Sequence, residues 1–322
     1  MWRFLWRSCA QIAFVALGIT LINFFLLRLA PGDAAQALAG QSGAATPEYM
    51  AALRRQLGLD QALYVQFFLY AKKLLTFDLG FSFHFGLPVA ELIWQRLPAT
   101  LLLMGSAIAF ALFLGCLLGF FAALCSGKIV DVLFSVFTLL IYATPAFWVG
   151  MMLILVFSVR LDLLPIGGMI TVEKNLIGFA YIKDVLAHLV LPAVTLGLYY
   201  FAVYTRLTRA EMLALSGREF VRTARAKGVR AWRIAWRHIF RNALLPVVTT
   251  LGVQLGSILG GAVLVETVFS WPGMGRMAMS SLLQRDTNLL LGILFCSSLM
   301  VVFINIVVDL VYMRLDPRIR PE

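Results

Sequence analysis

Long apolar runs separated by polar segments dominate the chain. A transmembrane helix needs about 20 mostly apolar residues, and the runs come close to that length or exceed it. They lie at residues 9–27, 99–124, 130–159, 188–205, 247–269 and 289–312. The pattern therefore predicts an all-α, polytopic membrane protein with six transmembrane helices and a single transmembrane domain over residues 1–322.

The first and third runs each contain a feature that affects their interpretation. Arg3 and Arg7 precede the first run, as in a signal peptide, but the run is longer than the apolar core of about 7–15 residues in such peptides. We therefore interpret it as a membrane span. Pro145 lies in the middle of the third run and predicts a kink there.

Composition supports a membrane location. Hydrophobic residues make up 61% of the chain and charged residues 13%, whereas soluble domains average about 25% charged residues. The positive charge is concentrated in residues 206–241, which hold ten Lys or Arg against two Glu, a balance of +8 within the formal +11. Residues 33–98 and 160–187 are each neutral. Because basic loops stay in the cytoplasm, we expect both termini and the basic loop, residues 206–246, to be cytoplasmic.

Residues 31–98 form the longest polar segment, expected on the outer side. Thr46-Pro47-Glu48 predicts the start of a helix that Gly58 ends, and residues 61–75 have an amphipathic pattern. A neutral helical segment of this kind suits a docking surface for a partner protein, and it suits a packing cap equally well.

The basic loop carries its own helix signals. Ser216 and Glu219 have the spacing of a capping box, which starts a helix. Gly228 is placed to end it, since glycine enters the left-handed conformation without a Cβ penalty. A second helix is expected over residues 230–243, and Pro246 opens the next apolar run. A loop that only obeys the positive-inside rule would not need these signals.

Several strings resemble the permeases of binding-protein-dependent ABC importers, in their dipeptide, oligopeptide and nickel branch. The basic loop contains TARAKG and, further on, RHxxRNALLPV. They resemble the family motif E-A-A-x3-G with its later L-P, although only Ala224 and Gly228 match and Arg222 and Thr223 replace its first two residues. RLAPGD, DLGFS, ETVFSWPGMG and LDPR are further family-like strings between residues 28 and 318.

The resemblance implies a function and a set of partners. The chain would be one membrane subunit of an ATP-driven importer of peptides or similar small solutes in a bacterial-type inner membrane, working by alternating access. Its partners would be a second homologous permease, two ATP-binding cassette ATPase subunits and an extracytoplasmic substrate-binding protein. The short helix in the basic loop would be the coupling helix that docks on an ATPase, with coupling residues Glu219, Arg222, Thr223, Ala224, Arg225, Ala226, Lys227 and Gly228.

Other candidate residues lie in the fifth and sixth runs. Glycines at four-residue spacing allow another helix to approach closely, and these are Gly252, Gly256 and Gly260. Glu266, near the end of the fifth run, is expected to bond backbone N–H groups around Gly273 and Gly275, and a functional role is the alternative. Asp309 is expected to pair with an arginine or to cap a helix, and a role in transport chemistry is the alternative.

No motif for catalysis or for a cofactor is present. The four cysteines lack CxxC spacing, no HExxH occurs, and Gly127-Lys128 is followed by Ile129 and does not complete a phosphate-binding loop. We therefore expect no enzyme, no metal and no cofactor, with ATP on the partner subunits. A channel or secondary transporter, or a membrane-embedded enzyme, are the alternatives. The solute cannot be read from the sequence.

The charge asymmetry generates a test of topology. In a cysteine-free background, a cysteine replacing Ser42 or Thr171 should react with an impermeant thiol reagent added to sealed cells. A cysteine replacing Ala226 should react only after the membrane is opened, because the positive loop stays inside. Labelling of Ala226→Cys in sealed cells would reverse the assignment.

Overall fold

The structure is a computed structural model that describes residues 2–29, 46, 51, 55, 60–82, 84–172 and 176–315. The chain divides into two compact units, which are residues 1–94 with 281–303 and residues 95–280 with 304–320. Three helices, α5, α12 and α13, run from one unit into the other.

Among the elements whose bounds the structure describes, the first unit contains two helices of its own, one hairpin and parts of the three shared helices. Its own elements are α1 (Trp2–Leu29), α4 (Leu63–Leu75), β1 (Phe81–Ser82) and β2 (Leu87–Pro88). The shared helices are α5 (Val89–Leu124), α12 (Met274–Leu283) and α13 (Thr287–Leu315). The two strands are antiparallel, with Phe81 opposite Pro88.

Aromatic packing joins α1 to α4. The buried ring of Phe24 lies edge-on to Phe67, with centroids 5.5 Å apart, and 6.1 Å from the ring of Tyr70. Burial raises the pKa of Tyr70 to about 12. The amphipathic helix expected at residues 61–75 is thus present as α4, and it packs two of its aromatic rings against Phe24 of α1.

Asp286 holds the start of α13. Its carboxylate accepts hydrogen bonds from the backbone N–H of Leu289, at 3.1 Å, and from the hydroxyl of Ser82 in β1. The first bond satisfies one of the free N–H groups at a helix start. Gly292 lies one turn further on, where an added Cβ would stand 2.5 Å from Val89 at the start of α5.

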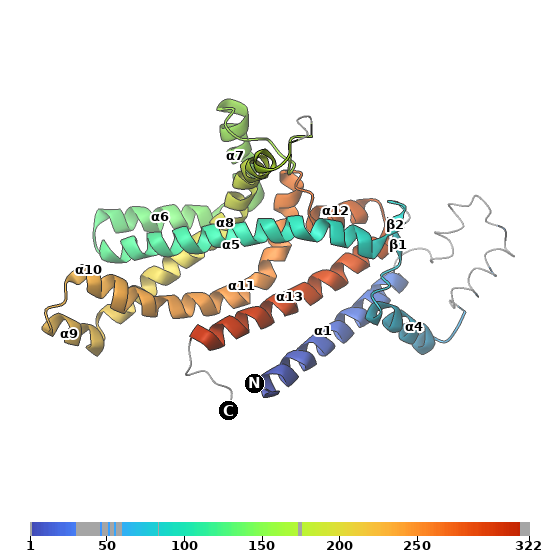
Figure 1. Ribbon diagram of the computed structural model, residues 1–322, viewed down its shortest axis with the longest axis horizontal. Coiled ribbons are helices and arrows are strands. Elements are labelled where there is room, and N and C mark those ends of the chain that lie inside the picture. The colour runs from blue at the N-terminus through green and yellow to red at the C-terminus, as the bar shows by residue number, and fades with distance from the viewer. Residues whose placement is uncertain are drawn as a thin grey trace. The chain divides into compact units, whose positions relative to one another are not determined.

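The second unit is a bundle of long helices (Figure 1). Besides the shared helices it contains α6 (Ile129–Ala143), α7 (Ala146–Leu153), the π-helical η1 (Ile154–Arg160), α8 (Phe179–Ser216), α9 (Glu219–Ala226), α10 (Ala231–Arg233), the π-helical η3 (Ile234–Phe240) and α11 (Arg241–Val268). Figure 1 shows α9 and α10 at the end of this unit where α5 ends and α6 begins. We call this end, with residues 120–131 and 209–241, the loop end.

Helix α8 is the core of the second unit. In the most apolar 18-residue stretch of α8, 67% is buried, against 39% in the corresponding stretch of α5. Helices α6, α7 and α11 all pack on α8. Glycines bring α5 and α8 into backbone contact: a Cβ on Gly115 would lie 3.0 Å from Phe201 O, and one on Gly119 would lie 2.6 Å from Thr205 O. Gly197 of α8 meets Ala107 O of α5 in the same way, at 2.8 Å. These three glycines therefore allow the backbones of α5 and α8 to approach closely.

A buried carboxylate organises the turn between α11 and α12. Glu266 is completely buried and accepts hydrogen bonds from the Thr100 hydroxyl at 2.7 Å and from the Arg276 backbone N–H at 2.9 Å. Thr100 in turn accepts a bond from the Met274 N–H, and the Trp271 indole donates to Ala99 O at 2.9 Å. The side chain ties this turn to α5.

The membrane spans agree in part with the sequence prediction. Among the described residues, four helices are long and apolar enough to cross a membrane, and α6 with α7–η1 makes a fifth if the bent pair is one span. The four are Ala10–Arg28, Val89–Leu124, Phe179–Ser216 and Thr287–Val308. Helix α11 covers the expected fifth run, 247–269, but several of its side chains lie outside the described residues. The count of six stays a prediction.

The third run is broken rather than kinked. Helices α6 and α7 meet at 104° across Thr144-Pro145. The residue before a proline avoids the α-helical region, and Thr144 has ψ of 131°. Pro145 is itself extended, with ψ of 132°, and starts α7 as its N-cap. The bend predicted at Pro145 is therefore confirmed in position, and the assignment of the bent pair to one span stays a prediction.

Helix boundaries near the basic loop also differ from the prediction. Helix α8 covers Phe179–Ser216 rather than 188–205, so parts of both neighbouring polar segments are helical. Helix α11 contains Pro246 in its interior and continues from η3 without a break, so no new helix opens at the proline. Membrane helices tolerate such prolines because neighbouring groups satisfy the freed carbonyl. The helix expected between Thr46 and Gly58 lies outside the described residues.

The Glu266 turn generates a prediction. A Cβ on Gly273 would stand 2.1 Å from Glu266 Oε1, and that carboxylate is fixed by its hydrogen bonds. Gly273→Ala should therefore lower the free energy of unfolding by about 3 kcal/mol, from overpacking and a weakened buried carboxylate. Thermal unfolding of the purified chain in detergent measures this.

Gly260→Ala is the matched control. Gly260 is exposed in α11, and no atom lies within 4 Å of its added Cβ, so its melting temperature should stay at or slightly above the wild-type value. Equal melting temperatures for the two variants would contradict the role given to the Glu266 turn.

Candidate functional site

The candidate site is the helix α9 in the basic loop and the elements that hold it. Helix α9 ends as the sequence predicts. Gly228 has φ of +74°, its N–H bonds Arg225 O at 2.9 Å, and the N–H of Val229 bonds Ala224 O at 3.2 Å. These two bonds form a Schellman motif, which needs a left-handed residue at the Gly228 position. The glycine stop is confirmed.

The start of α9 differs from the prediction. Arg218 is its N-cap and makes no side-chain capping bond. Ser216 is the last residue of α8, and its hydroxyl donates to Leu213 O at 2.7 Å. The capping box was therefore wrong: α9 begins two residues later than the box requires, and Ser216 belongs to α8. Glu219 instead pairs with Arg222 at 3.2 Å on the surface.

Helix α9 has one inward and one outward face. Val221 is completely buried and Ala224 is 7% exposed, and the helix packs against η3. The other predicted coupling side chains are all exposed, namely Glu219, Arg222, Thr223, Arg225, Ala226 and Lys227. Phe220 adds an aromatic ring that is 39% exposed. The free face thus combines charge with a hydrophobic ring, which is the composition of a docking surface.

An aromatic cluster fixes the segment that follows α9. The buried ring of Phe120 in α5 lies 5.2 Å from Trp232, 5.3 Å from Trp236 and 5.2 Å from Phe240. The rings of Trp236 and Phe240 also stack, at 4.9 Å. Edge-to-face ring pairs of this kind add stability beyond their buried area. The return segment, residues 230–241, is thereby fastened to the last turns of α5.

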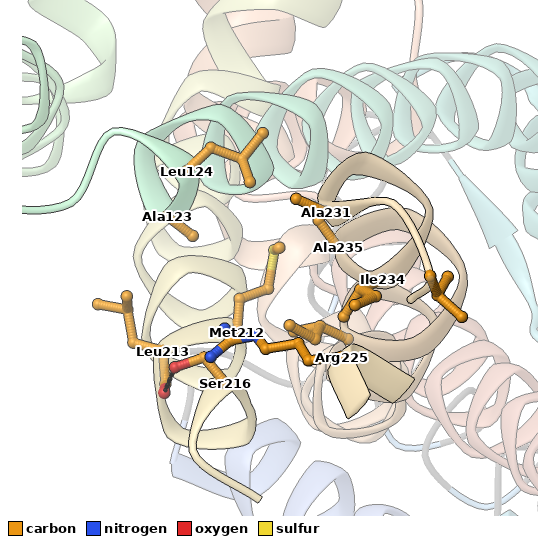
Figure 2. Close-up of a pocket in the computed structure, with 11 residues that line it drawn as sticks. Ala123, Leu124, Met212, Leu213, Ser216, Arg225, Ala231, Ile234 and Ala235 are labelled. Carbon is orange, nitrogen blue, oxygen red and sulfur yellow. Dashed lines mark hydrogen bonds between the residues drawn. The ribbon is translucent and has the colours of Figure 1, made fainter. Parts of the chain in front are cut away.

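A cavity of about 420 Å³ lies behind α9 (Figure 2). It is lined mainly by apolar residues from the ends of α5 and α8 and from η3, including Leu124, Met212 and Ile234. Arg225 and Ser216 also line it. Helix α9 is therefore held through a few inward contacts and not packed along its whole length.

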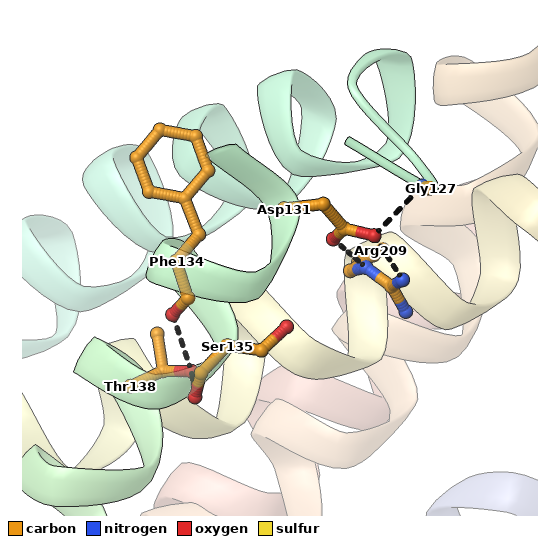
Figure 3. Close-up of polar contacts among 6 residues, drawn as sticks. All are labelled: Gly127, Asp131, Phe134, Ser135, Thr138 and Arg209. Carbon is orange, nitrogen blue, oxygen red and sulfur yellow. Dashed lines mark hydrogen bonds and ion pairs between the residues drawn. The ribbon is translucent and has the colours of Figure 1, made fainter. Parts of the chain in front are cut away.

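An ion pair joins α6 to α8 at the same end (Figure 3). Asp131, in the first turn of α6, accepts two hydrogen bonds from the Arg209 guanidinium, at 2.6 and 2.7 Å, and one from the Gly127 N–H at 3.2 Å. The Asp131 side chain is 8% exposed and that of Arg209 30%. Bidentate arginine–carboxylate pairs fix orientation as well as distance.

The remaining candidates lie away from α9. An added Cβ on Gly252 would meet Val308 of α13 at 2.8 Å, whereas Gly260 has no atom near it. The surroundings of Gly256 and the side chain of Asp309 lie outside what the structure describes. No group of His, Cys, Asp and Glu able to hold a metal ion occurs in the part of the chain that the structure describes.

Comparison with known proteins identifies the chain. Residues 115–321 match the family model "Binding-protein-dependent transport system inner membrane component", and residues 1–104 match the model of its N-terminal region. The chain belongs to this family. It is a permease subunit of an ABC importer, embedded in the inner membrane by several helices.

Relatives match over the full length. The dipeptide transport system permease protein DppB of Escherichia coli K12 is 38% identical over 99% of both chains. A putative peptide permease of Brucella suis is 39% identical over 98% of this chain and 99% of its own. The di/tripeptide transport system permease protein DppB of Pseudomonas aeruginosa is 37% identical over the whole of both chains.

Family membership decides between the interpretations left open by the sequence. The permease is a transport component and not an enzyme, a channel or a secondary transporter. A binding-protein-dependent system implies a substrate-binding protein and ATPase subunits as partners. The loop end, with the exposed face of α9, is the candidate surface for the ATPase.

Sequence reasoning missed two features of this surface. Trp232, Trp236 and Phe240 repeat every four residues, which is a signal for one aromatic helix face. Asp131 and Arg209 are each a charge close to an apolar run, but nothing in the sequence pairs them. The aromatic repeat could therefore be found from the sequence, and the ion pair could not.

The ion pair generates a prediction. Asp131→Asn should lower the free energy of unfolding of the purified permease by about 1–2 kcal/mol, because it leaves the partly buried Arg209 without its charged partner. Arg209→Gln should do the same, and the double variant should lose clearly less than the sum. Thermal unfolding checks these values.

The exposed pair of Glu219 and Arg222 provides the control. Both side chains are largely in solvent, at 86% and 70% exposed, so Glu219→Gln should leave the unfolding temperature unchanged. Strict additivity of Asp131→Asn and Arg209→Gln would show that the two side chains do not interact.

Proposed function

We propose that this permease is one of two homologous membrane subunits of an importer for dipeptides or other short peptides. The relatives named above are peptide permeases and cover the whole chain. In this proposal two ATPase subunits bind and hydrolyse ATP, this chain binds no cofactor, and an extracytoplasmic protein delivers the peptide. The observation that carries the coupling role is α9, a short exposed helix closed by a left-handed glycine and set between two membrane helices.

The covalent connections of α9 make it a lever. Its N-terminal side follows α8, the buried core helix, after only Gly217 and Arg218. Its C-terminal side leads through α10 and η3 directly into α11. A displacement of α9 by an ATPase therefore acts on two long helices at once. We infer that these helices swing the translocation pathway between its inward-open and outward-open forms.

Two further contacts spread such a displacement. The Phe120 cluster links the return segment to α5, and the Asp131–Arg209 pair links α8 to α6. Helices α5, α6, α8 and α11, which all reach the loop end, would then move together. The cavity behind α9 leaves space for the helix to shift without unpacking the core.

The proposed contact with the ATPase uses the exposed face of α9. Glu219, Arg222, Thr223, Ala226 and Lys227 present their side chains outward. Arg225 and Ala224 position the helix, and Gly228 sets its end. The +8 balance of the basic loop supports placing this face and both termini in the cytoplasm.

Gly228→Val tests the coupling role. A left-handed backbone costs an L-residue about 1–2 kcal/mol, and more for a β-branched one, while no atom within 4 Å blocks the new side chain. The variant should reach the membrane at near-normal levels, yet lose most uptake of a labelled dipeptide in a strain that depends on this importer. ATPase association should weaken, or hydrolysis should continue without transport.

A control variant and an intermediate variant complete the test. Gly217→Val is the control, because Gly217 is exposed with φ of −90° and has no neighbour within 4 Å, so uptake should be near normal. Gly228→Asn should fall between wild type and Gly228→Val, since asparagine tolerates the left-handed region. Normal uptake by Gly228→Val at wild-type abundance would make the loop a topological anchor only.

A further inference from the structure

The return segment carries a row of arginines that the coupling role does not use. They are spaced by three, four and four residues along α10, η3 and the first residue of α11, and all are exposed: Arg230, Arg233, Arg237 and Arg241. This spacing brings side chains to one side of a helical segment. We call these residues the arginine stripe.

The arginine stripe has no acidic partner within the described chain. The ion pairs of arginine that the structure contains there join Arg209 to Asp131 and Arg222 to Glu219. The only acidic residues of the basic loop are Glu211 and Glu219. Four adjacent guanidinium groups repel one another, so a neutralising group from outside the chain would stabilise them.

The depth of the stripe follows from its aromatic contacts. Trp232 and Trp236 lie against Phe120, one turn before α5 ends at Leu124, and α5 is long and apolar enough to cross a membrane. The return segment therefore runs beside the end of a membrane helix and not beyond it. Arg241 is followed at once by the mainly apolar α11. A change from a basic segment to an apolar helix at this point is what is expected at the level of the lipid headgroups.

The exposed rings of the same segment suit a contact with lipid headgroups. Trp232 is 58% exposed and Trp236 48%, although both touch Phe120. Tryptophan collects at the membrane–water interface, where its ring is apolar and its N–H is hydrated. Arginine side chains there bind phosphate with two N–H groups at a time.

We propose that the arginine stripe binds the phosphate groups of anionic phospholipids and holds the return segment at headgroup level. The contact goes beyond the coupling role of α9 and does not depend on it. It keeps the return segment at the lipid surface while a displacement of α9 passes along this segment to α11.

The test compares two triple variants of the purified full-length chain that remove the same charge. One is Arg233→Gln with Arg237→Gln and Arg241→Gln, and the other is Arg222→Gln with Arg225→Gln and Lys227→Gln on α9. Binding of phosphatidylglycerol and of phosphatidylcholine with the same acyl chains is measured by native mass spectrometry. Each basic residue near an anionic surface contributes about fivefold in affinity.

The stripe variant should lose at least tenfold in phosphatidylglycerol affinity and approach its affinity for phosphatidylcholine, and the α9 variant should lose less than threefold. Replacement of the same three stripe arginines by lysine should keep most of the preference, which separates charge from folding. Equal losses in the two glutamine variants, or a wild type with no preference for phosphatidylglycerol, would overturn the proposal. So would loss of ATPase association by the stripe variant with lipid binding intact.

A second measurement needs no change of charge. In the wild-type chain, headgroup-proximal brominated phosphatidylglycerol should quench tryptophan fluorescence more than the matching phosphatidylcholine. The difference should disappear in the Trp232→Phe, Trp236→Phe variant, because these rings lie beside the stripe. Quenching that is the same for both lipids in the wild type would contradict a specific contact.

Discussion

The close approach of α5 and α8 is the contact on which the second unit depends. In lipid, apolar surface gains little from burial, so helices associate through tight packing and small residues. Gly115, Gly119 and Gly197 remove the side chains that would separate the two backbones. The result is a central helix, α8, with α5 fixed along it. Every feature of the loop end is attached to one of these two helices.

The loop end shows how a short helix can be exposed and still be firmly connected. Helix α9 buries only Val221 and Ala224 among its side chains, too little to hold eight residues by hydrophobic burial. Its position comes instead from its two ends. Ser216 closes α8 directly before it, and the Schellman motif at Gly228 turns the chain into the return segment. The end of α8 and the return segment are both packed on the α5–α8 pair. These two flanking segments, and not the contacts of α9 itself, therefore determine where α9 lies.

The sequence predicted those features that depend on one residue's own backbone or on a long apolar run. Gly228 was predictable because only glycine fits a left-handed helix end without cost, and the break at Pro145 was predictable in position for a similar reason. Its angle of 104° was not, since packing decides how far a broken helix turns. The capping box failed because Ser216 serves α8, and sequence spacing cannot say which of two adjoining helices a residue joins. The Asp131–Arg209 pair joins residues 78 positions apart, for which a single sequence holds no signal.

The charges of this permease separate into two kinds according to whether the chain itself neutralises them. Asp131, Glu266 and Asp286 are buried, and each is satisfied by named donors: an arginine, a hydroxyl or a backbone N–H. An unpaired charge in that position would cost several kcal/mol, so the fold supplies its own partners there. The arginine stripe has no such partner among the described residues, and it is exposed at the one level where a membrane supplies phosphate. The same rule, that a charge removed from water needs a partner, thus produces one ion pair and several hydrogen bonds within the protein and an external contact at the loop end.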